Sequence, residues 1–253
     1  MRLHSGLWMR LRNLQLMKDE ELRMKNGIKR VEFVVTKACS SYCAHCSWGD
    51  ALQGDGRAID GVVAARKVAE LAAEHSIESV MTFGGEPLLF PDVVVQIHDA
   101  AFRAGIVRRQ LITNGYFSKD AKRIDAVAKM LCDAEVNDIL ISVDAFHQAH
   151  APLEYVLAFG RSLLAFGATK VRAHPAWVVN EQHDNAYNSE TKRLLAVFAE
   201  AGIAASGGND IIMSGNAVKN LSEFADESLQ VSPYAGDGGV VSFEPDSFIA
   251  DGA

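Results

Sequence analysis

The sequence predicts an α/β fold in which a parallel sheet carries helices on its outer side. Strand and helix patterns alternate along most of the chain, and the connections between them are short, which is typical of parallel sheets. Almost half of the 253 residues are hydrophobic, so we expect one ordinary globular unit with a sizeable core.

The strand candidates are short apolar segments, and each of the first five precedes a helical pattern. Strands are expected at residues 30–36, 77–83, 106–113, 136–143, 170–179 and, with the weakest pattern, 203–213. Helices are expected at residues 60–75, 92–104, 119–133, 152–166 and 189–201. Glycines stand where three of these helices would be capped, namely Gly105, Gly167 and Gly202. In such a fold the carboxyl ends of the strands meet at one edge, where ligands bind.

Charge and hydropathy narrow the class of protein. The net charge of −7 gives no electrostatic reason to expect a nucleic acid or an acidic membrane surface as partner. No uninterrupted apolar run approaches the roughly eighteen residues of a membrane span. The N-terminal residues lack the apolar core of a secretory signal, and cysteines are few, so we expect a cytoplasmic protein.

Three of the four cysteines lie close together in the segment TKACSSYCAHCSWGD, residues 36–50. Cys39, Cys43 and Cys46 have the spacing C-x3-C-x2-C. Disulfides explain this spacing poorly, because an odd trio leaves one thiol over and only Cys132 remains elsewhere. A short loop of soft thiolates can instead wrap one metal centre.

Two metal centres fit this loop. Structural zinc takes four closed ligands, and His45, His75 or Cys132 would have to complete the set. Bonding both His45 and its neighbour Cys46 to one ion would strain the loop. An iron–sulfur cluster held by three thiolates leaves one iron without a protein ligand, and a catalytic centre needs such an open position. The motif favours the cluster, with zinc as the alternative.

A second motif lies in the segment ESVMTFGGEPLLFP. Residues 80–83 are expected to form a buried strand, and Gly84, Gly85, Glu86 and Pro87 the turn at its carboxyl end. Paired glycines let the backbone come close to a ligand, and Glu86 adds a carboxylate beside them. An ordinary strand-to-helix turn is the alternative interpretation.

Taken together, VEFVVTKACSSYCAHCS and MTFGGEP closely resemble the motifs of the radical S-adenosylmethionine enzyme superfamily. The resemblance implies a partial (β/α)6 TIM-like barrel of parallel strands, with an iron–sulfur cluster loop after strand 1. It also implies that Cys39, Cys43 and Cys46 hold a [4Fe–4S] cluster. The amino and carboxylate groups of S-adenosylmethionine would then occupy the fourth iron.

The chain is expected to fall into three parts. Residues 1–27 have the pattern of an amphipathic helical extension, and residues 28–215 correspond to the radical S-adenosylmethionine partial barrel. Residues 216–253 form a C-terminal extension whose turns and apolar run resemble a hairpin. Asn216 stands where some members of the resembled family have Arg. No cysteine follows Cys132, which argues against an auxiliary-cluster domain.

Polar residues at strand ends are the remaining candidates for the cofactor site. Thr113 and Asn114 end the third strand, and Ser142 and Asp144 end the fourth on one face. In the resembled family, residues at the end of the fourth strand contact the ribose and methionine parts of S-adenosylmethionine. His45 replaces the commonest Tyr, Phe or Trp, and its ring is expected to pack on the adenine.

The fifth strand carries two further polar residues on one face, Arg172 and His174. They either point into the barrel, Arg172 toward a carboxylate and His174 toward substrate, or lie outward against a helix. His147 and His150 follow the fourth strand and either reach the substrate or are solvated in the loop. Cys132 is expected to be a small buried hydrophobe. The predicted cofactor-binding residues are His45, Gly84, Gly85, Glu86, Thr113, Asn114, Ser142, Asp144 and Arg172.

The resemblance implies an enzyme of oxidoreductase or transferase type. It would reductively cleave S-adenosylmethionine at the cluster, and the resulting 5'-deoxyadenosyl radical would abstract hydrogen from a peptide, protein or small molecule. A small electron donor such as flavodoxin or ferredoxin is the expected partner. One alternative is an activase that installs a glycyl radical on a partner enzyme. Another is a non-catalytic metal-binding redox sensor or scaffold.

Overall fold

The computed structural model describes residues 27–52, 56–228 and 239–245. The expected N-terminal helix therefore lies outside the described residues, as does most of the expected C-terminal hairpin. The boundaries of the three expected parts of the chain remain a prediction.

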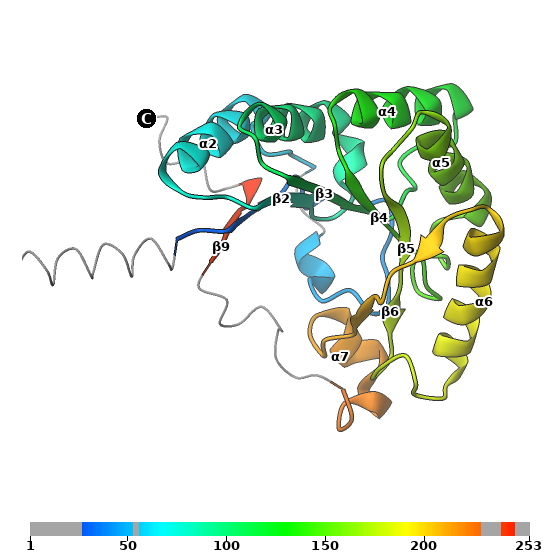
Figure 1. Cartoon of the computed structure of the whole chain (residues 1–253). Coiled ribbons are helices and arrows are strands. Elements are labelled where there is room, and N and C mark those ends of the chain that lie inside the picture. The colour runs from blue at the N-terminus through cyan, green and yellow to red at the C-terminus, as the bar shows by residue number, and fades with distance from the viewer. Residues whose placement is uncertain (1–26, 53–55, 229–238, 246–253) are drawn as a thin grey trace, which may run out of the picture.

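A curved parallel sheet of seven strands forms the centre of the molecule (Figure 1). Its strands, in spatial order, are β7 (Ala204–Ala205), β5 (Val171–His174), β4 (Asp138–Ser142), β3 (Arg108–Thr113), β2 (Ser79–Phe83), β1 (Arg30–Val34) and β9 (Val240–Phe243). The edge strands β7 and β9 do not pair with each other in the described part of the chain. The sheet is therefore an open, partial barrel, which confirms the predicted fold class.

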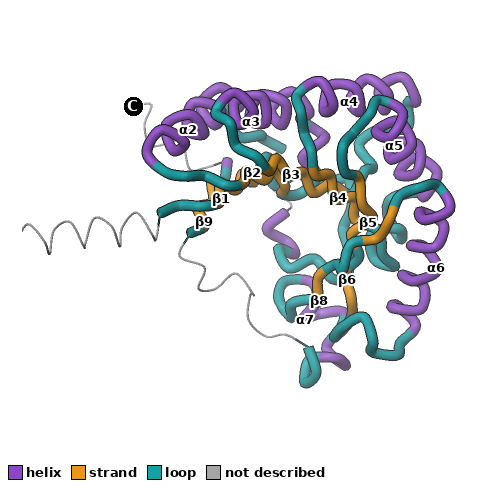
Figure 2. The backbone as a smooth tube through the Cα atoms, in the orientation of Figure 1, coloured by secondary structure: helices purple, strands orange, loops and turns teal. Residues whose placement is uncertain are grey.

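Five helices cover the convex side of the sheet (Figure 2). They are α2 (Gly61–Glu74), α3 (Pro91–Arg103), α4 (Ala121–Asp133), α5 (Leu153–Ala165) and α6 (Ala186–Glu200). Asp60 and Asp120 cap α2 and α4 by accepting hydrogen bonds from N–H groups of the first turn. Short helical turns also occur at η1 (Gly49–Leu52), η2 (Pro87–Leu89), α7 (Asn216–Asn220) and η3 (Ser222–Phe224).

The fifth expected strand is interrupted at Pro175, which has no N–H to donate to a ladder. After it, β6 (Ala176–Trp177) leaves the main sheet and pairs with β8 (Asn209–Asp210). The sixth expected strand is likewise split into β7 and β8. Gly208 lies between them at φ 74°, and a Cβ there would lie 2.3 Å from the Pro175 carbonyl oxygen. The strands β6 and β8 form a separate two-stranded wall beside the barrel, which we call the β6–β8 wall.

The strand β9 is the part of the expected C-terminal hairpin that lies within the described residues. It pairs in parallel with β1, with Val241 opposite Val31, so its neighbour in the main sheet is distant in sequence. The hairpin itself stays a prediction. Phe243 stacks on Phe33 with 5.4 Å between ring centroids. Long-range packing of these apolar side chains places β9 at the sheet edge, and a local turn pattern cannot reveal such packing.

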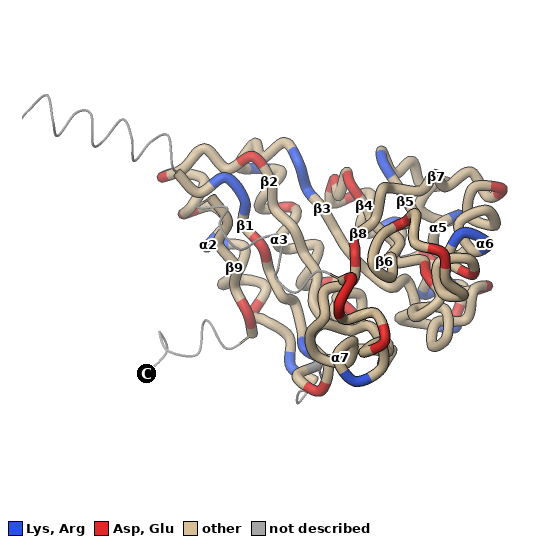
Figure 3. Tube along the Cα trace, turned by 90° about the horizontal axis from the view of Figure 1, so that it is seen from below, with Lys and Arg blue, Asp and Glu red and all other residues tan. Residues whose placement is uncertain are grey.

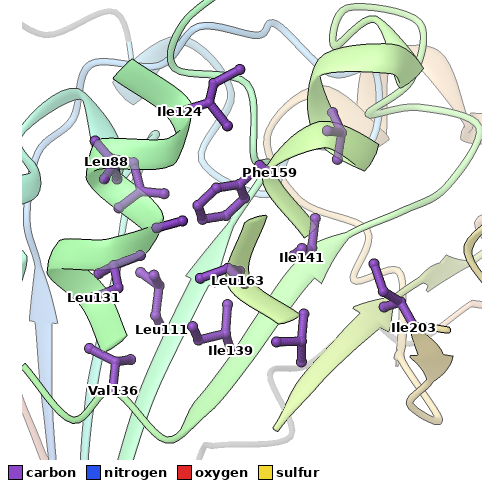
Figure 4. Packing of buried hydrophobic residues seen from close by; sticks show 14 of the residues in the cluster. Leu88, Leu111, Ile124, Leu131, Val136, Ile139, Ile141, Phe159, Leu163 and Ile203 are labelled. Carbon is purple, nitrogen blue, oxygen red and sulfur yellow. The ribbon is translucent and has the colours of Figure 1, made fainter. Parts of the chain in front are cut away.

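The main core fills the space between the sheet and helices α4, α5 and α6 (Figure 4). Leu111, Ile139 and Ile141 project from neighbouring strands toward Phe159 and Leu163 of α5. All five side chains are fully buried. A second cluster under α2 and α3 covers β1 and β2. The outer face of the sheet is therefore apolar.

Replacement of Phe159 by Ala should lower the free energy of unfolding by about 3–5 kcal/mol, because a large ring leaves a cavity that its neighbours fill only in part. Phe166 follows α5 and is 42% exposed, so Phe166→Ala should stay within roughly 1 kcal/mol of the parent. Urea unfolding measures both variants. An equal loss of unfolding free energy in Phe159→Ala and Phe166→Ala would show that this core does not stabilise the barrel.

Candidate functional site

A pocket of about 490 Å³ lies at the carboxyl-terminal edge of the sheet. It is lined by the segment after β1, by the ends of β2, β3 and β4, and by the β6–β8 wall. This is the edge at which parallel strands present their ligands. The volume is in the range of small-molecule and cofactor sites.

The three clustered cysteines all line this pocket. We call residues 38–47 the cysteine loop; in it, Cys46 N–H donates a hydrogen bond to the Cys43 carbonyl at 3.1 Å. Cys39, Cys43 and Cys46 are free thiols. Cys132 lies on α4, packed against the main core with its Sγ 3.9 Å from the Leu163 carbonyl oxygen. Cys132 is expected to be a small buried hydrophobic residue; it packs against the core apart from the site, but it is only partly buried.

Gly84 and Gly85 hold the cysteine loop against the end of β2. Gly85 N–H donates to the Thr36 carbonyl, and Glu86 N–H to the Ala38 carbonyl, both at 2.8 Å. A Cβ on Gly84 would lie 2.5 Å from the Thr36 oxygen, and one on Gly85 would lie 2.0 Å from the Ala38 oxygen. Glycine is required because two stretches of the chain's own backbone meet here. Both glycines also line the pocket.

Glu86 does not line the pocket, which corrects its expected place beside a ligand. Its side chain is fully buried and accepts hydrogen bonds from Thr113 Oγ1 at 2.6 Å, Asn114 N–H at 2.8 Å and Leu88 N–H at 2.9 Å. The carboxylate thereby joins the ends of β2 and β3. Burial raises the pKa of Glu86 to about 7, although the three donors favour the charged form.

Asn114 connects β3 to the cysteine loop. Its Nδ2 donates to Ser40 Oγ at 3.0 Å and lies 3.8 Å from Cys39 Sγ. Its Oδ1 accepts from Tyr116 N–H at 2.8 Å, which fixes the amide orientation. Thr113 and Asn114 are both in the pocket lining, as expected from their position at a strand end.

Asp144 is the buried acid at the end of β4, and its carboxylate is held on all sides. Oδ1 accepts from the N–H groups of Phe146 and His147, while Oδ2 accepts from Ala176 N–H and lies 2.7 Å from His147 Nδ1. Burial alone would raise the pKa of Asp144, but the charge and hydrogen bonds of His147 outweigh it and lower that pKa well below its usual range. Burial lowers the pKa of His147, and the Asp144 carboxylate reverses the shift, so the pKa of His147 is raised. Asp144, His147 and Ser142 all line the pocket.

The ring of His45 lies in the same pocket, against Phe146 with 4.9 Å and His147 with 4.8 Å between centroids. Its Nδ1 is buried and has no hydrogen-bond partner among the described residues. Burial lowers the pKa of His45 to about 4, so the ring is neutral. A buried polar atom without a partner is costly, which marks this position as one where a bound ligand can satisfy it.

Arg172 is absent from the pocket lining, which corrects its predicted role as a cofactor-binding residue. It pairs with the Asp138 carboxylate on the inner face of the sheet. Gln110 also donates to Asp138, at 2.9 Å, and accepts from Arg30 at 2.6 Å. Arg30 in turn pairs with Glu32. This polar network occupies the inner face near the start of the strands, and Arg172 belongs to it because its partner carboxylate lies at the start of β4.

His174 and His150 lie in different surroundings. His174 lines the pocket, with Nδ1 2.7 Å from Ser206 Oγ, whereas His150 is exposed and outside the lining. Of the two alternatives for the fifth strand, Arg172 toward a carboxylate and His174 toward the pocket is the one found.

Sequence reasoning missed a clamp on the cysteine loop formed by the start of α7. Asn216 is 1% exposed, and it donates from Nδ2 to the Cys43 carbonyl at 3.1 Å and from its backbone N–H to the Cys46 carbonyl at 2.9 Å. Gly215 precedes it at φ 55°, and a Cβ there would lie 2.5 Å from the Ser47 carbonyl oxygen. The only sequence signal is the segment IIMSGNAVKN, in which Asn216 stands where some members of the resembled family have Arg.

The positions of the candidate fourth ligands distinguish between the two metal centres. A structural zinc site needs four closed ligands. Of His45, His75 and Cys132, only His45 lines the pocket together with the three cysteines. Because His45 adjoins Cys46, binding both to one ion would strain the loop, which favours an iron–sulfur cluster held by the three thiolates.

The electrostatics of the thiols favour a bound metal centre of either kind. Burial, with a contribution from the Glu86 carboxylate, raises the pKa of Cys39 to about 11. Burial and Asp144 raise the pKa of Cys43 further. The pocket lining contains no Lys or Arg in the described part of the chain. A positive metal centre is therefore needed to ionise these thiols at neutral pH.

Fold and site together define an α/β partial barrel with a three-thiol metallocofactor pocket. Residues 33–163 match the Radical SAM superfamily, and the chain belongs to this family. Its enzymes bind a [4Fe–4S] cluster and S-adenosylmethionine, and the residues of this pocket fit both.

Individual relatives match only part of the chain or only its fold. A GTP 3',8-cyclase from Tolumonas auensis is 30% identical over 134 residues, which are 51% of this chain and 36% of that protein. Streptococcus suis SuiB bound to S-adenosylmethionine has a TM-score of 0.56 at 13% identity, over 96% of this chain and 57% of that one. A structure described as anSMEcpe with bound AdoMet and Cp18Cys peptide has a TM-score of 0.53 at 14% identity, over 74% and 51%. The chain thus spans about a third to somewhat over half of these relatives.

No helix in the described ranges combines the length and hydropathy that crossing a membrane requires.

The burial of Glu86 predicts a pH dependence of stability. Its folded pKa of about 7 lies above the ordinary value of 4.5, so its stabilising contribution is complete below 4.5 and is lost as the pH rises through 7. Glu86→Gln removes this titration. The free energy of unfolding of the parent minus that of the variant should therefore fall between about pH 5 and about pH 8.

Urea unfolding of the apoprotein at several pH values measures the difference, with the exposed Glu154→Gln as control for the loss of one charge. A difference that stays constant or rises with pH would contradict the assignment of the raised pKa to Glu86.

Proposed function

We propose that this chain is a radical S-adenosylmethionine enzyme that reductively cleaves S-adenosylmethionine and uses the product to abstract hydrogen from its substrate. The observation that carries the proposal is that Cys39, Cys43 and Cys46 line one pocket in a chain of the Radical SAM superfamily. When bound, the cluster and S-adenosylmethionine supply one-electron bond cleavage and hydrogen-atom abstraction.

In this proposal the three cysteine thiolates hold the cluster and leave its fourth iron for S-adenosylmethionine. The pairing of Gly85 and Glu86 with the backbone at Thr36 and Ala38 supports the role of the glycines as the anchor of the cysteine loop. Asn114 steadies the loop from β3 through its bond to Ser40. These groups fix the positions of the thiols before any cofactor binds, which lowers the cost of binding.

The polar groups along the rest of the pocket are proposed to orient S-adenosylmethionine. Ser142 and Asp144 at the end of β4 would face its ribose and methionine parts, and the unpartnered Nδ1 of His45 would meet a polar atom of the adenine. Asp144 keeps its charge because its pKa is low, and it holds His147 in one orientation through the contact at Nδ1. A site of this kind must also exclude water, which would otherwise quench a reactive species.

The substrate is proposed to be a peptide, protein or small molecule, because the barrel is open along the side between its edge strands. The relatives differ in the molecules that their names mention: one is named as a GTP cyclase, and another is a complex with a peptide. A small protein electron donor such as flavodoxin or ferredoxin is the proposed partner. The low cysteine count fits the reducing conditions of the cytoplasm, where we propose that the protein acts.

The direct test is anaerobic reconstitution with iron and sulfide, followed by an assay for 5'-deoxyadenosine after addition of S-adenosylmethionine and a strong reductant. The parent and Cys132→Ala should each bind about four irons per chain and release 5'-deoxyadenosine. Cys43→Ala should lose both properties. Stoichiometric zinc, or equal iron binding by Cys43→Ala and the parent, would contradict the proposal.

The clamp by Asn216 gives a second prediction. Asn216→Ala removes one buried hydrogen bond to the Cys43 carbonyl, so the reconstituted variant should lose iron to a chelator roughly threefold to tenfold faster than the parent. Asn220 makes a comparable bond to the Ala44 carbonyl from an exposed position, where water replaces it, so Asn220→Ala should change the rate less. Circular dichroism checks that both variants fold. Identical rates of iron loss in the parent and both variants would show that Asn216 does not stabilise the cluster site.

A further inference from the structure

The β6–β8 wall of the pocket comes from a different part of the chain than the proposed cofactor residues. Asn209 and Asp210 of this wall line the pocket together with His174 at the end of β5, and none of them takes part in holding the cysteine loop. Figure 3 shows the acidic colour along the chain at β8. A pocket wall that the cofactor does not need is available to the substrate.

Hydrogen bonds within and beside this wall determine which of its polar atoms remain available to a ligand. Ser206 Oγ donates to the Ala173 carbonyl at 3.3 Å, so it accepts from His174 Nδ1–H at 2.7 Å. The other ring nitrogen, Nε2, must then accept, and it does so from Asn209 Nδ2 at 3.0 Å. Burial lowers the pKa of His174 to about 4, which agrees with the neutral ring that this order of bonds requires.

The order of bonds leaves two acceptor groups of the wall available to a ligand, the Asn209 carbonyl oxygen and the Asp210 carboxylate. Asn209 uses one of its two amide N–H groups on His174, so its second N–H and its Oδ1 remain available. The neighbouring Asp210 carboxylate has no hydrogen-bond or ion-pair partner among the described residues, and partial burial raises its pKa. The other two carboxylates of the lining are already engaged, Glu32 by Arg30 and Asp144 by His147.

We propose that the substrate of this pocket presents a cationic nitrogen group, a primary ammonium or a guanidinium, to Asn209 and Asp210. Such a group has several N–H donors and a positive charge, and both complement the Asp210 carboxylate and the Asn209 carbonyl oxygen. A phosphate-bearing substrate would instead need cationic or N–H donors, and the described lining contains no Lys or Arg. The inference rests on the proposed function, since it concerns the substrate of the same site.

The test uses four probes on the anaerobically reconstituted full chain with S-adenosylmethionine and without reductant. They are the Nα-acetyl amides of lysine, norleucine and glutamate, together with GTP. Equilibrium dialysis with mass-spectrometric quantification gives the affinity of each. The lysine probe should bind on the order of tenfold more tightly than the norleucine probe, because a charge-assisted hydrogen bond adds to the same apolar stem.

Asp210→Asn keeps the shape of the side chain and removes its charge, so it should abolish the preference for lysine over norleucine. Asp184→Asn, an exposed change outside the pocket lining, should leave the preference unchanged. Equal affinities for the lysine and norleucine probes, no detectable binding of the lysine probe, tighter binding of glutamate or GTP, or an unchanged preference in Asp210→Asn would each overturn the inference. Iron content and 5'-deoxyadenosine release of the same preparations test the proposed function separately.

Discussion

The pairing of the backbone after β1 with the backbone after β2 is the constraint on which the site depends. Thr36 and Ala38 accept hydrogen bonds from Gly85 and Glu86, and no side chain larger than hydrogen fits at either glycine. This close approach fixes where the cysteine loop leaves the sheet. It also directs the Glu86 side chain into the interior, where it binds the end of β3.

Further contacts extend the same constraint to the rest of the cysteine loop. Asn114 reaches it from the end of β3, while Asn216 holds the carbonyls of Cys43 and Cys46 from the far side. The three thiols are thus positioned by residues distant in sequence. We infer that the protein supplies a preformed frame, so that the cofactor does not have to order the loop.

The two faces of the sheet explain why much of the fold was predictable and part of the site was not. On the outer face, apolar residues such as Leu111 and Ile139 pack against helices, and their periodicity predicted the first four strands and the five helices. On the inner face, Asp138 and Arg172 pair across neighbouring strands. The sequence shows that Arg172 is polar, but its partner is set by strand register, which local patterns do not specify.

The same reasoning accounts for the other differences. The motif around Gly84 marked the correct turn, yet whether Glu86 faces a ligand or the interior depends on Thr113 and Asn114, which come from another strand. Asn216 lies far from the cysteines in sequence and has no spacing motif that links it to them. Cysteine spacing, in contrast, is local, and it placed all three thiols in one pocket.

The central claim is that three thiols hold a cluster whose fourth iron binds S-adenosylmethionine. Electron paramagnetic resonance of the anaerobically reconstituted and reduced protein, recorded with and without S-adenosylmethionine, tests it most directly. The account predicts the signal of a reduced [4Fe–4S] cluster whose shape changes when S-adenosylmethionine is added, since the ligand binds the iron itself. A signal that does not respond, or a protein that holds zinc and gives no signal, would contradict it.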